Sequence, residues 1–308
     1  MLDLKNILVP IDLSEHSVQA LPFAADLARR FGSTLVLVHA ASGRRAAQKA
    51  QGTLERLAAN LGGLPARAVL GVASPLELVL ELSDKTENPL VLMYTHGRRG
   101  LARGVLGSTA CQIVSYAHCP VWTVKRADLR LLEQPAEGEA EPGAAVMKIR
   151  RILVTTNLKA ESMLGVDYAG AFARALGADL MLLHVFRAEL PGSGLFDRRR
   201  HALKFLEQVG RRVGIPSDQV FLESGSPVRT TVEIARKYGA DLIVQATRGP
   251  RMVAGLLLGS TSRAVSRRAG CPVLTVRTPE NDFLVGEGAK AAAVDEAPAP
   301  NLVELART

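Results

Sequence analysis

One segment of this chain occurs twice. Gly97, nine further residues and Gly107-Ser108-Thr109 return as Gly249, nine further residues and Gly259-Ser260-Thr261. Cys-Pro-Val-x-Thr-Val follows each copy at the same distance, and every matched pair is 152 positions apart. A fixed period over matched glycines and hydroxyl residues indicates two copies of one structural unit. We therefore predict two tandem domains of the same fold.

Apolar segments of strand length alternate with helical segments in both copies. They read as continuous apolar runs, which is typical of strands in a buried parallel sheet. The pattern predicts an α/β fold of two tandem Rossmann-like domains, each an open five-stranded parallel sheet flanked by helices. The predicted strands are 5–11, 34–40, 66–70, 90–94 and 121–125 in the first copy, and 151–155, 179–185, 219–222, 242–246 and 273–277 in the second.

Helix starts are also visible in the first copy. Ser14 is a suitable N-cap, and an apolar stripe from Val18 to Ala28 predicts one continuous helix after it. Ser74-Pro75 opens another helix with proline in its first turn. A third helix is predicted over Ser108–Tyr116, directly after the glycine segment, so that Ser108 is a candidate cap.

Composition and charge divide the 308 residues further. We predict domain 1 at 1–127, an acidic linker at 128–147, domain 2 at 148–278 and a disordered tail at 279–308. The net charges are +5 and +11 for the two domains and −4 each for the linker and the tail. Basic domains favour anionic partners but do not choose among nucleotides, nucleic acid and acidic surfaces. The run 198–201 is interpreted as a solvated helix face rather than a nucleic-acid site, because no aromatic or glycine pattern accompanies it.

Several classes of protein are not expected. The N-terminus has no signal-peptide pattern and no apolar run is long enough for a membrane helix, so we expect a cytoplasmic protein without membrane contact. The three cysteines form no C-x-x-C pair and no His/Cys cluster with metal spacing. Cys119 and Cys271 are interpreted as buried structural residues, and His39 and His184 as hydrogen-bonded histidines at strand ends.

The repeated glycine segment has two interpretations. It leaves the carboxyl end of the fourth strand, where ligands bind in open α/β sheets. Glycine permits close backbone approach, and free N–H groups at the start of the next helix attract phosphate. Alternatively, the glycines are ordinary turns and Ser108 is an ordinary cap. The repeat leaves both interpretations open.

These motifs together resemble the universal stress protein family. The resemblance rests on Gly97-x9-Gly107-Ser108, on Ile7-Leu8-Val9-Pro10-x-Asp12-x-Ser14 and on a strand ending at His39. It covers residues 3–127 and 148–278, and many members of that family are tandem proteins. It implies a five-stranded parallel sheet and, in some members, ATP at the strand ends. The implied ligand-binding residues are Pro10 and Asp12 near adenine and ribose, the backbone of Ala40 at the base, Gly97, Gly107, Ser108 and Thr109 at ribose and phosphates, and the equivalents Gly249, Gly259, Ser260 and Thr261.

Both copies depart from the family pattern. ATP-binding members usually have another glycine three positions before Gly97, but this chain has Tyr94, whose phenol would obstruct the ribose or stack nearby. The second copy has Ala246 at that position, Asn157 in place of Asp12 and Thr155 in place of Pro10. Asparagine keeps an acceptor but loses the negative charge. The resemblance therefore implies two altered sites, with the first the better candidate.

Three functions follow as hypotheses. The leading one is a cytoplasmic universal stress protein with a regulatory role, which binds ATP with Mg2+ and is not an enzyme, because Asp12 is the only carboxylate near the expected ligand. The second is a nucleotide-free tandem interaction module whose domains pair through Val121–Val124 and Val273–Val276. The third is a slow ATPase. In-chain pairing allows a monomer or a homodimer, and nucleic acid is not an expected partner.

Overall fold

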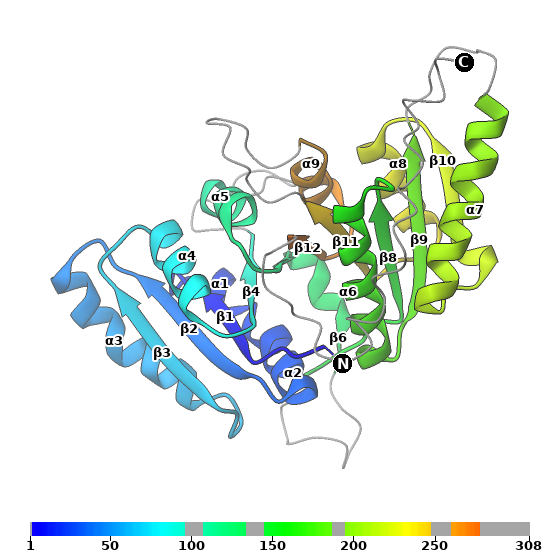
Figure 1. Cartoon of the computed structure of the whole chain (residues 1–308). Coiled ribbons are helices and arrows are strands. Elements are labelled where there is room, and N and C mark those ends of the chain that lie inside the picture. The colour runs from blue at the N-terminus through cyan, green and yellow to red at the C-terminus, as the bar shows by residue number, and fades with distance from the viewer. Residues whose placement is uncertain (1, 96–106, 134–144, 187–194, 248–259, 278–308) are drawn as a thin grey trace.

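The protein is described here by a computed structural model, which covers residues 2–95, 107–133, 145–186, 195–247 and 260–277. Two runs of alternating strands and helices form two similar halves (Figure 1). The first half contains β1 (Asn6–Pro10), α1 (Glu15–Val18), α2 (Leu21–Phe31), β2 (Thr34–Ala40), α3 (Arg44–Ala59), β3 (Ala66–Gly71), α4 (Pro75–Lys85), β4 (Pro89–Tyr94), α5 (Ser108–Tyr116) and β5 (Val121–Val124). The second half contains β8 (Arg151–Thr156), α6 (Ala160–Leu176), β9 (Asp179–Phe186), α7 (Leu195–Val213), the 3-10 turn η2 (Ser217–Gln219), β10 (Val220–Ser224), α8 (Pro227–Lys237), β11 (Leu242–Thr247), α9 (Ser260–Arg268) and β12 (Val273–Arg277).

The strands of each half are parallel, as the sequence predicts. Their order is β3-β2-β1-β4-β5 in the first half and β10-β9-β8-β11-β12 in the second. The predicted α/β class and the five parallel strands of each half are therefore confirmed. The two sheets are not separate, however, because β5 pairs with β12 in antiparallel orientation and joins them into one ten-stranded sheet.

The helix predicted after Ser14 is interrupted. Ser14 caps α1 as expected, and its side chain accepts a hydrogen bond from the Ser17 N–H, but α1 ends at Val18 and α2 begins at Leu21. Pro22 in the first turn of α2 explains the break, because proline has no N–H to donate to the Val18 carbonyl. The prediction of one continuous helix was wrong at this point.

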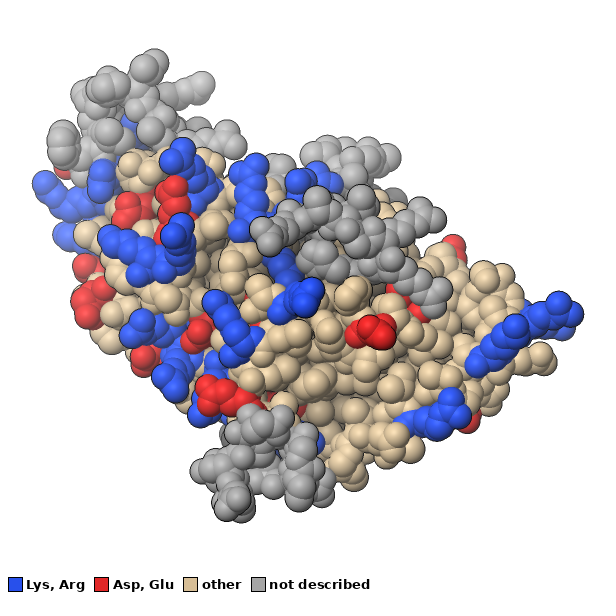
Figure 2. Space-filling view, turned by 180° about the vertical axis from the view of Figure 1, so that it is seen from behind, with Lys and Arg blue, Asp and Glu red and all other residues tan. Residues whose placement is uncertain are grey.

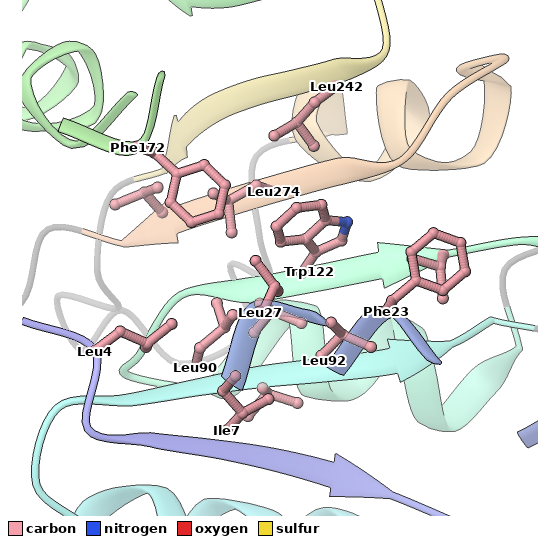
Figure 3. Packing of buried hydrophobic residues seen from close by; sticks show 14 of the residues in the cluster. Leu4, Ile7, Phe23, Leu27, Leu90, Leu92, Trp122, Phe172, Leu242 and Leu274 are labelled. Carbon is pink, nitrogen blue, oxygen red and sulfur yellow. The ribbon is translucent and has the colours of Figure 1, made fainter. Parts of the chain in front are cut away.

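The junction of the halves is built around Trp122. Trp122 of β5 lies opposite Leu274 of β12, and its side chain is fully buried. The ring of Phe172, from α6, meets the indole edge-on at 5.3 Å between centroids (Figure 3). The same ring stacks on Phe31 of α2 at 5.6 Å between centroids. Aromatic contacts of this kind add to the stabilisation from burial alone. The predicted pairing through the last strands is confirmed, and both halves contribute to one core.

The predicted linker is structured at both of its described ends. Residues Arg126–Leu131 form a 3-10 helix, η1, and the short strands β6 (Leu132–Glu133) and β7 (Val146–Met147) pair with each other. The Met147 N–H donates to Asp26 Oδ2 of α2 at 3.2 Å, which holds β7 against the first half. The domain boundaries stay a prediction, because one buried cluster contains residues of both halves. The predictions for 134–144 and for the tail lie outside the described residues.

Candidate functional site

The strand order creates a topological switch point at one edge of each half. In the first half β1 lies between β2 and β4, so the connections that follow β1 and β4 run in opposite directions along the sheet. Open α/β sheets bind ligands outside the carboxyl ends of the strands at such a switch point. Pro10 ends β1 and Tyr94 ends β4 at this edge. The same arrangement of β8 and β11 recurs in the second half, where Thr156 and Thr247 end the strands.

Asp12 is part of the turn that leaves β1. Its Oδ1 accepts a hydrogen bond from the Ser14 N–H at 2.9 Å, and Ser14 in turn caps α1. Leu13, between them, has a φ of 59°, a left-handed conformation that costs a branched residue about 1 kcal/mol or more. The carboxylate thus stabilises a strained turn as well as lying, half-buried, at the switch point.

The ends of β1 and β2 are tied together by a histidine. His39 Nδ1 lies 2.7 Å from the carbonyl oxygen of Ile11, and the Ile11 N–H donates to Val38 O at 2.8 Å. Ala40 ends β2 beside this pair. The second half repeats the bond, with His184 Nδ1 at 2.8 Å from Thr156 O, and burial lowers the pKa of His184. The prediction of hydrogen-bonded histidines is confirmed.

Gly107 brings the start of α5 to the end of β4. Its N–H donates to Thr95 O at 3.1 Å, and its carbonyl accepts from the Cys111 N–H at 2.8 Å. Gly107 is therefore the N-cap, and Ser108 is the first helical residue, without a capping bond and exposed to solvent. The prediction that Ser108 caps the helix was wrong. The N–H groups of Ser108 and Thr109 lie in the first turn of α5, where no acceptor within the helix is available to them.

The structure brings Pro10, Asp12, Ala40, Gly107, Ser108 and Thr109 to one edge of the first half. Gly97 lies outside the described residues, as do Gly249 and Gly259 of the second half. Ser260 and Thr261 begin α9 at the equivalent edge. The described part of the expected site is thus assembled in the first half, while two of the four residues expected in the second are placed.

Tyr94 does not project from the edge. Its side chain is 7% exposed and packs beside α1, where its ring stacks on His16 at 6.2 Å between centroids. Burial raises the pKa of the phenol. The ring therefore fills the space between β4 and α1, directly beside the Asp12 turn, where the second half has Ala246.

Helix α6 approaches β11 closely at that position. A Cβ added to Gly165 would lie 2.6 Å from the Cβ of Ala246, well inside contact distance. Gly165 and Ala246 are therefore a matched pair of small residues, and the space beside the second turn depends on both.

Replacing Gly165 with alanine is expected to lower the free energy of unfolding by about 1–3 kcal/mol, because overpacking against Ala246 outweighs the gain in helix propensity. Gly52 in α3 is the matched control, since a Cβ there meets nothing within 4 Å. Gly52→Ala should raise the same free energy by up to about 1 kcal/mol. Urea denaturation measures both changes, and equal signs for the two variants would contradict this packing.

A buried polar network supports α9 and was missed by sequence reasoning. Gln245 Nε2 of β11 donates to Ser262 O at 2.9 Å and lies 3.2 Å from Ser266 Oγ and 3.1 Å from Thr275 Oγ1. The first half has Met93, Ala110 and Val114 where the second has Gln245, Ser262 and Ser266. Aligning the two copies residue by residue would have revealed this exchange of an apolar layer for a polar one.

The described residues hold no obvious reactive centre. Burial raises the pKa of both Cys119 and Cys271 to about 12, so these thiols stay protonated, as expected of structural residues. The described ranges contain no group of three or more potential metal ligands from His, Cys, Asp and Glu. None of their helices is long and apolar enough to cross a membrane. Arg199, Arg200 and His201 are exposed on α7, which agrees with a solvated helix face.

Comparison with known proteins gives a consistent result. The model of the universal stress protein family matches residues 3–56, 42–125 and 148–277. Universal stress protein Rv2005c of Mycobacterium tuberculosis is 28% identical over 223 residues, covering 70% of this chain and 70% of that protein. A universal stress protein of Thermus aquaticus is 35% identical over 116 residues, covering 35% of this chain and 85% of that protein.

The fold has solved counterparts as well. The crystal structure of a universal stress protein from Archaeoglobus fulgidus matches with a TM-score of 0.66 and 21% identity, covering 88% of this chain and 98% of that one. At this identity the likeness shows a shared fold. The family model matches most of the chain and accounts for both halves. The chain is therefore a member of the universal stress protein family with its domains in tandem.

Proposed function

We propose that this protein is a cytoplasmic regulator of the stress response that binds ATP, with Mg2+, at the carboxyl edge of its sheet. The observation that carries the proposal is the convergence at the β1–β4 switch point. Asp12, the end of β2 at Ala40 and the start of α5 at Gly107 meet at one edge, although they are far apart in sequence. Helix-start N–H groups supply donors for phosphate, and Asp12 supplies an acceptor.

Binding without efficient catalysis fits this edge. Asp12 Oδ1 already accepts a hydrogen bond from the Ser14 N–H, which lowers the availability of this carboxylate as a base. His39 is bonded to the Ile11 carbonyl, so its Nδ1 is also committed. A dedicated hydrolase needs a positioned base and a means of stabilising charge in the transition state. A regulatory role therefore fits better than an enzymatic one, and slow ATP hydrolysis is the weaker alternative.

Calorimetry with ATP and Mg2+ on the full chain tests the binding. Heat of binding is expected for the wild type, and Asp12→Ala should weaken ATP binding by about tenfold, since a hydrogen bond to a charged group contributes about 1.5 kcal/mol. Asp12→Asn is the matched control, because it keeps the acceptor for the Ser14 N–H and so preserves the turn. Absence of heat in the wild type would refute the proposal, and unchanged affinity in Asp12→Ala would refute the placement.

The Tyr94 ring is expected to restrict nucleotide entry to the first half. Tyr94→Gly should strengthen ATP binding, because the phenol fills the space beside the Asp12 turn. It should also lower the free energy of unfolding by about 3 kcal/mol or more, since a buried aromatic side chain is lost. Tyr94→Ala gives the first half the residue of the second. It also removes the ring, but its Cβ leaves the strand backbone less free than glycine does, so it separates loss of the ring from the effect of glycine on the backbone. Equal ATP affinity in all three proteins would show that the ring does not obstruct the site.

The runner-up is a nucleotide-free tandem interaction module. It is favoured by the buried position of Tyr94 at the first switch point and by the joining of the two halves through β5 and β12. The same joining uses the strand through which two chains would otherwise pair, so we propose that the chain acts as a monomer. Retention of a stable monomer without any nucleotide in purified protein would support this alternative.

A further inference from the structure

The two halves have turns of the same geometry but of different charge. In the first, the Ser14 N–H donates to Asp12 Oδ1 at 2.9 Å; in the second, the Lys159 N–H donates to Asn157 Oδ1 at 3.0 Å. The residues after them also match, since Leu13 and Leu158 have φ values of 59° and 62°. Because the backbone of the turn and the bond to the side chain that opens it are the same in both halves, the exchange of Asp12 for Asn157 and of Ser14 for Lys159 changes the charge of the turn without changing its backbone geometry.

The charge difference favours anions at the second turn. Residues 12–16 carry a net charge of −2 with histidine neutral, whereas residues 157–161 carry a net charge of 0. Lys159 is exposed where the first half has Ser14. Both halves have arginines near the start of the next lateral helix, at Arg44 in α3 and Arg198 in α7, so those do not account for the difference.

A second difference lies at the last strand. In the first half Lys125 follows β5, and its Nζ donates to the carbonyls of Ala269 at 3.1 Å and Arg267 at 3.5 Å, at the end of α9. Its equivalent, Arg277, ends β12 and is 3% exposed. Within the described part of the chain, Arg277 Nε and Nη1 have no hydrogen-bond partner. The Lys125 ammonium is hydrogen-bonded to protein carbonyls, whereas Nε and Nη1 of Arg277 are left without such bonds.

A buried guanidinium with two unpartnered nitrogens, Nε and Nη1, calls for an anion. Removing a cation from water costs several kcal/mol unless acceptors replace the lost hydration, and buried side-chain nitrogens without partners are rare. Arg277 lies at the same carboxyl edge as Asn157, since Thr247 of β11 pairs with Arg277 while Gln245 pairs with Thr155 of β8. Two strand spacings separate β8 from β12, or about 10 Å, a span that a chain of three phosphates can bridge.

The helix at this edge of the second half also adds positive charge. Helix α9 begins at Ser260 and follows β11, the strand that lies between β8 and β12. Its first turn contains Arg263, where α5 has Cys111. The space-filling view shows that Lys and Arg side chains on this face gather mainly over the second half (Figure 2). The differences at Lys159, Arg263 and Arg277 therefore all make the edge of the second half more favourable for anions than that of the first.

We propose that the second half binds the polyphosphate chain of its ligand through Lys159 and Arg277, and so prefers triphosphates, whereas the first half lacks this preference. Arginine suits the task, because its planar fork can donate two hydrogen bonds to one phosphate. The inference rests on the proposed nucleotide binding only for the base and ribose. The phosphate assignment stands on the cations of the second half.

Calorimetry on the full chain with ATP, AMP and inorganic tripolyphosphate tests the assignment. Lys159→Ser and Arg277→Lys each give the second half the residue of the first. We expect Lys159→Ser to weaken ATP and tripolyphosphate binding by up to about fivefold, the effect of an exposed charge. Arg277→Lys should weaken them by about tenfold, because a fork is replaced by a point charge. AMP binding should change little, and Ser14→Lys is the reciprocal control in the first half.

A stability measurement separates binding from folding. Arg277→Met should leave the urea midpoint unchanged or raised, because an apolar side chain replaces an unpaired buried charge, yet it should still weaken tripolyphosphate binding. Binding of ATP with an ATP-to-AMP affinity ratio unaffected by any variant would overturn the inference and leave nucleotide binding standing. Tripolyphosphate binding that depends on Arg277, without nucleotide binding, would support the inference and overturn the proposed function. No binding of any of the three would overturn both.

Discussion

Replacing Trp122 with alanine is expected to lower the free energy of unfolding by about 3–5 kcal/mol, the range for deleting a large buried aromatic side chain. Trp122 is fully buried, faces Leu274 across the junction and contacts Phe172. Its loss therefore leaves a cavity shared by both halves. Urea denaturation followed by far-UV circular dichroism measures the change, since this is the only tryptophan and its fluorescence is lost with it.

Two control variants make this expectation specific. Trp122→Phe should cost much less than alanine, because it keeps an aromatic ring and removes an indole N–H that has no partner among the described residues. Val72→Ala, at a side chain that is 57% exposed, should change stability by less than about 0.5 kcal/mol. A loss below about 1 kcal/mol in Trp122→Ala would show that the halves do not depend on this contact.

Asp128 is expected to make the protein less stable as the pH rises. The carboxyl is fully buried, and burial raises its pKa from 3.8 to about 6, although Oδ2 accepts the Lys125 N–H at 2.7 Å. Between these two values the folded state holds a proton that the unfolded state has released, so stability falls as the pH rises from about 4 to 6. At about 1.4 kcal/mol per unit of pKa, the contribution reaches roughly 3 kcal/mol above pH 6.

Asp128→Asn isolates this contribution. The amide keeps an acceptor for the Lys125 N–H and cannot ionise, so the variant should be similar to the wild type at pH 4 and more stable than it at pH 7. Urea unfolding at several pH values measures the difference, and subtraction removes other groups, such as His184 with its lowered pKa. Asp218→Asn on the surface is the control and should show no such trend. A difference that is constant from pH 4 to 7 would contradict the buried-carboxyl account.

The repeat and the strand pattern were sufficient to predict most of the fold. The predicted strands agree closely with β1 to β5 and β8 to β12, and the β2 and β12 bounds coincide with those predicted. These elements follow from local chemistry, since apolar runs, caps and prolines act within a few residues. The break between α1 and α2 also has a local cause, Pro22, which the prediction from the apolar stripe did not take into account.

The candidate site was predictable only in part. The family resemblance implied that Asp12, Ala40 and Gly107 belong to one site, which agrees with parallel strands of a Rossmann-like sheet all ending on the same side. It did not reveal that Gly107 rather than Ser108 caps α5, since that depends on the bond from Gly107 N–H to Thr95 O, which joins residues that are not neighbours in the chain. Nor did it reveal that Tyr94 lies against His16, because a strand residue faces one of two helix layers and only packing shows which.

By itself the amino-acid sequence determined that the chain consists of two copies of a parallel α/β unit, and where its strands lie to within about two residues. Only the tertiary structure decided that the predicted pairing of the last strands is antiparallel, that Trp122 meets Phe172 at their junction, and that Arg277 is buried with Nε and Nη1 unpartnered. Periodicity and capping are properties of neighbouring residues and are legible in a sequence. Burial and pairing between the halves arise from contacts between residues far apart in the chain, whose geometry exists only once the sheet has closed over its core.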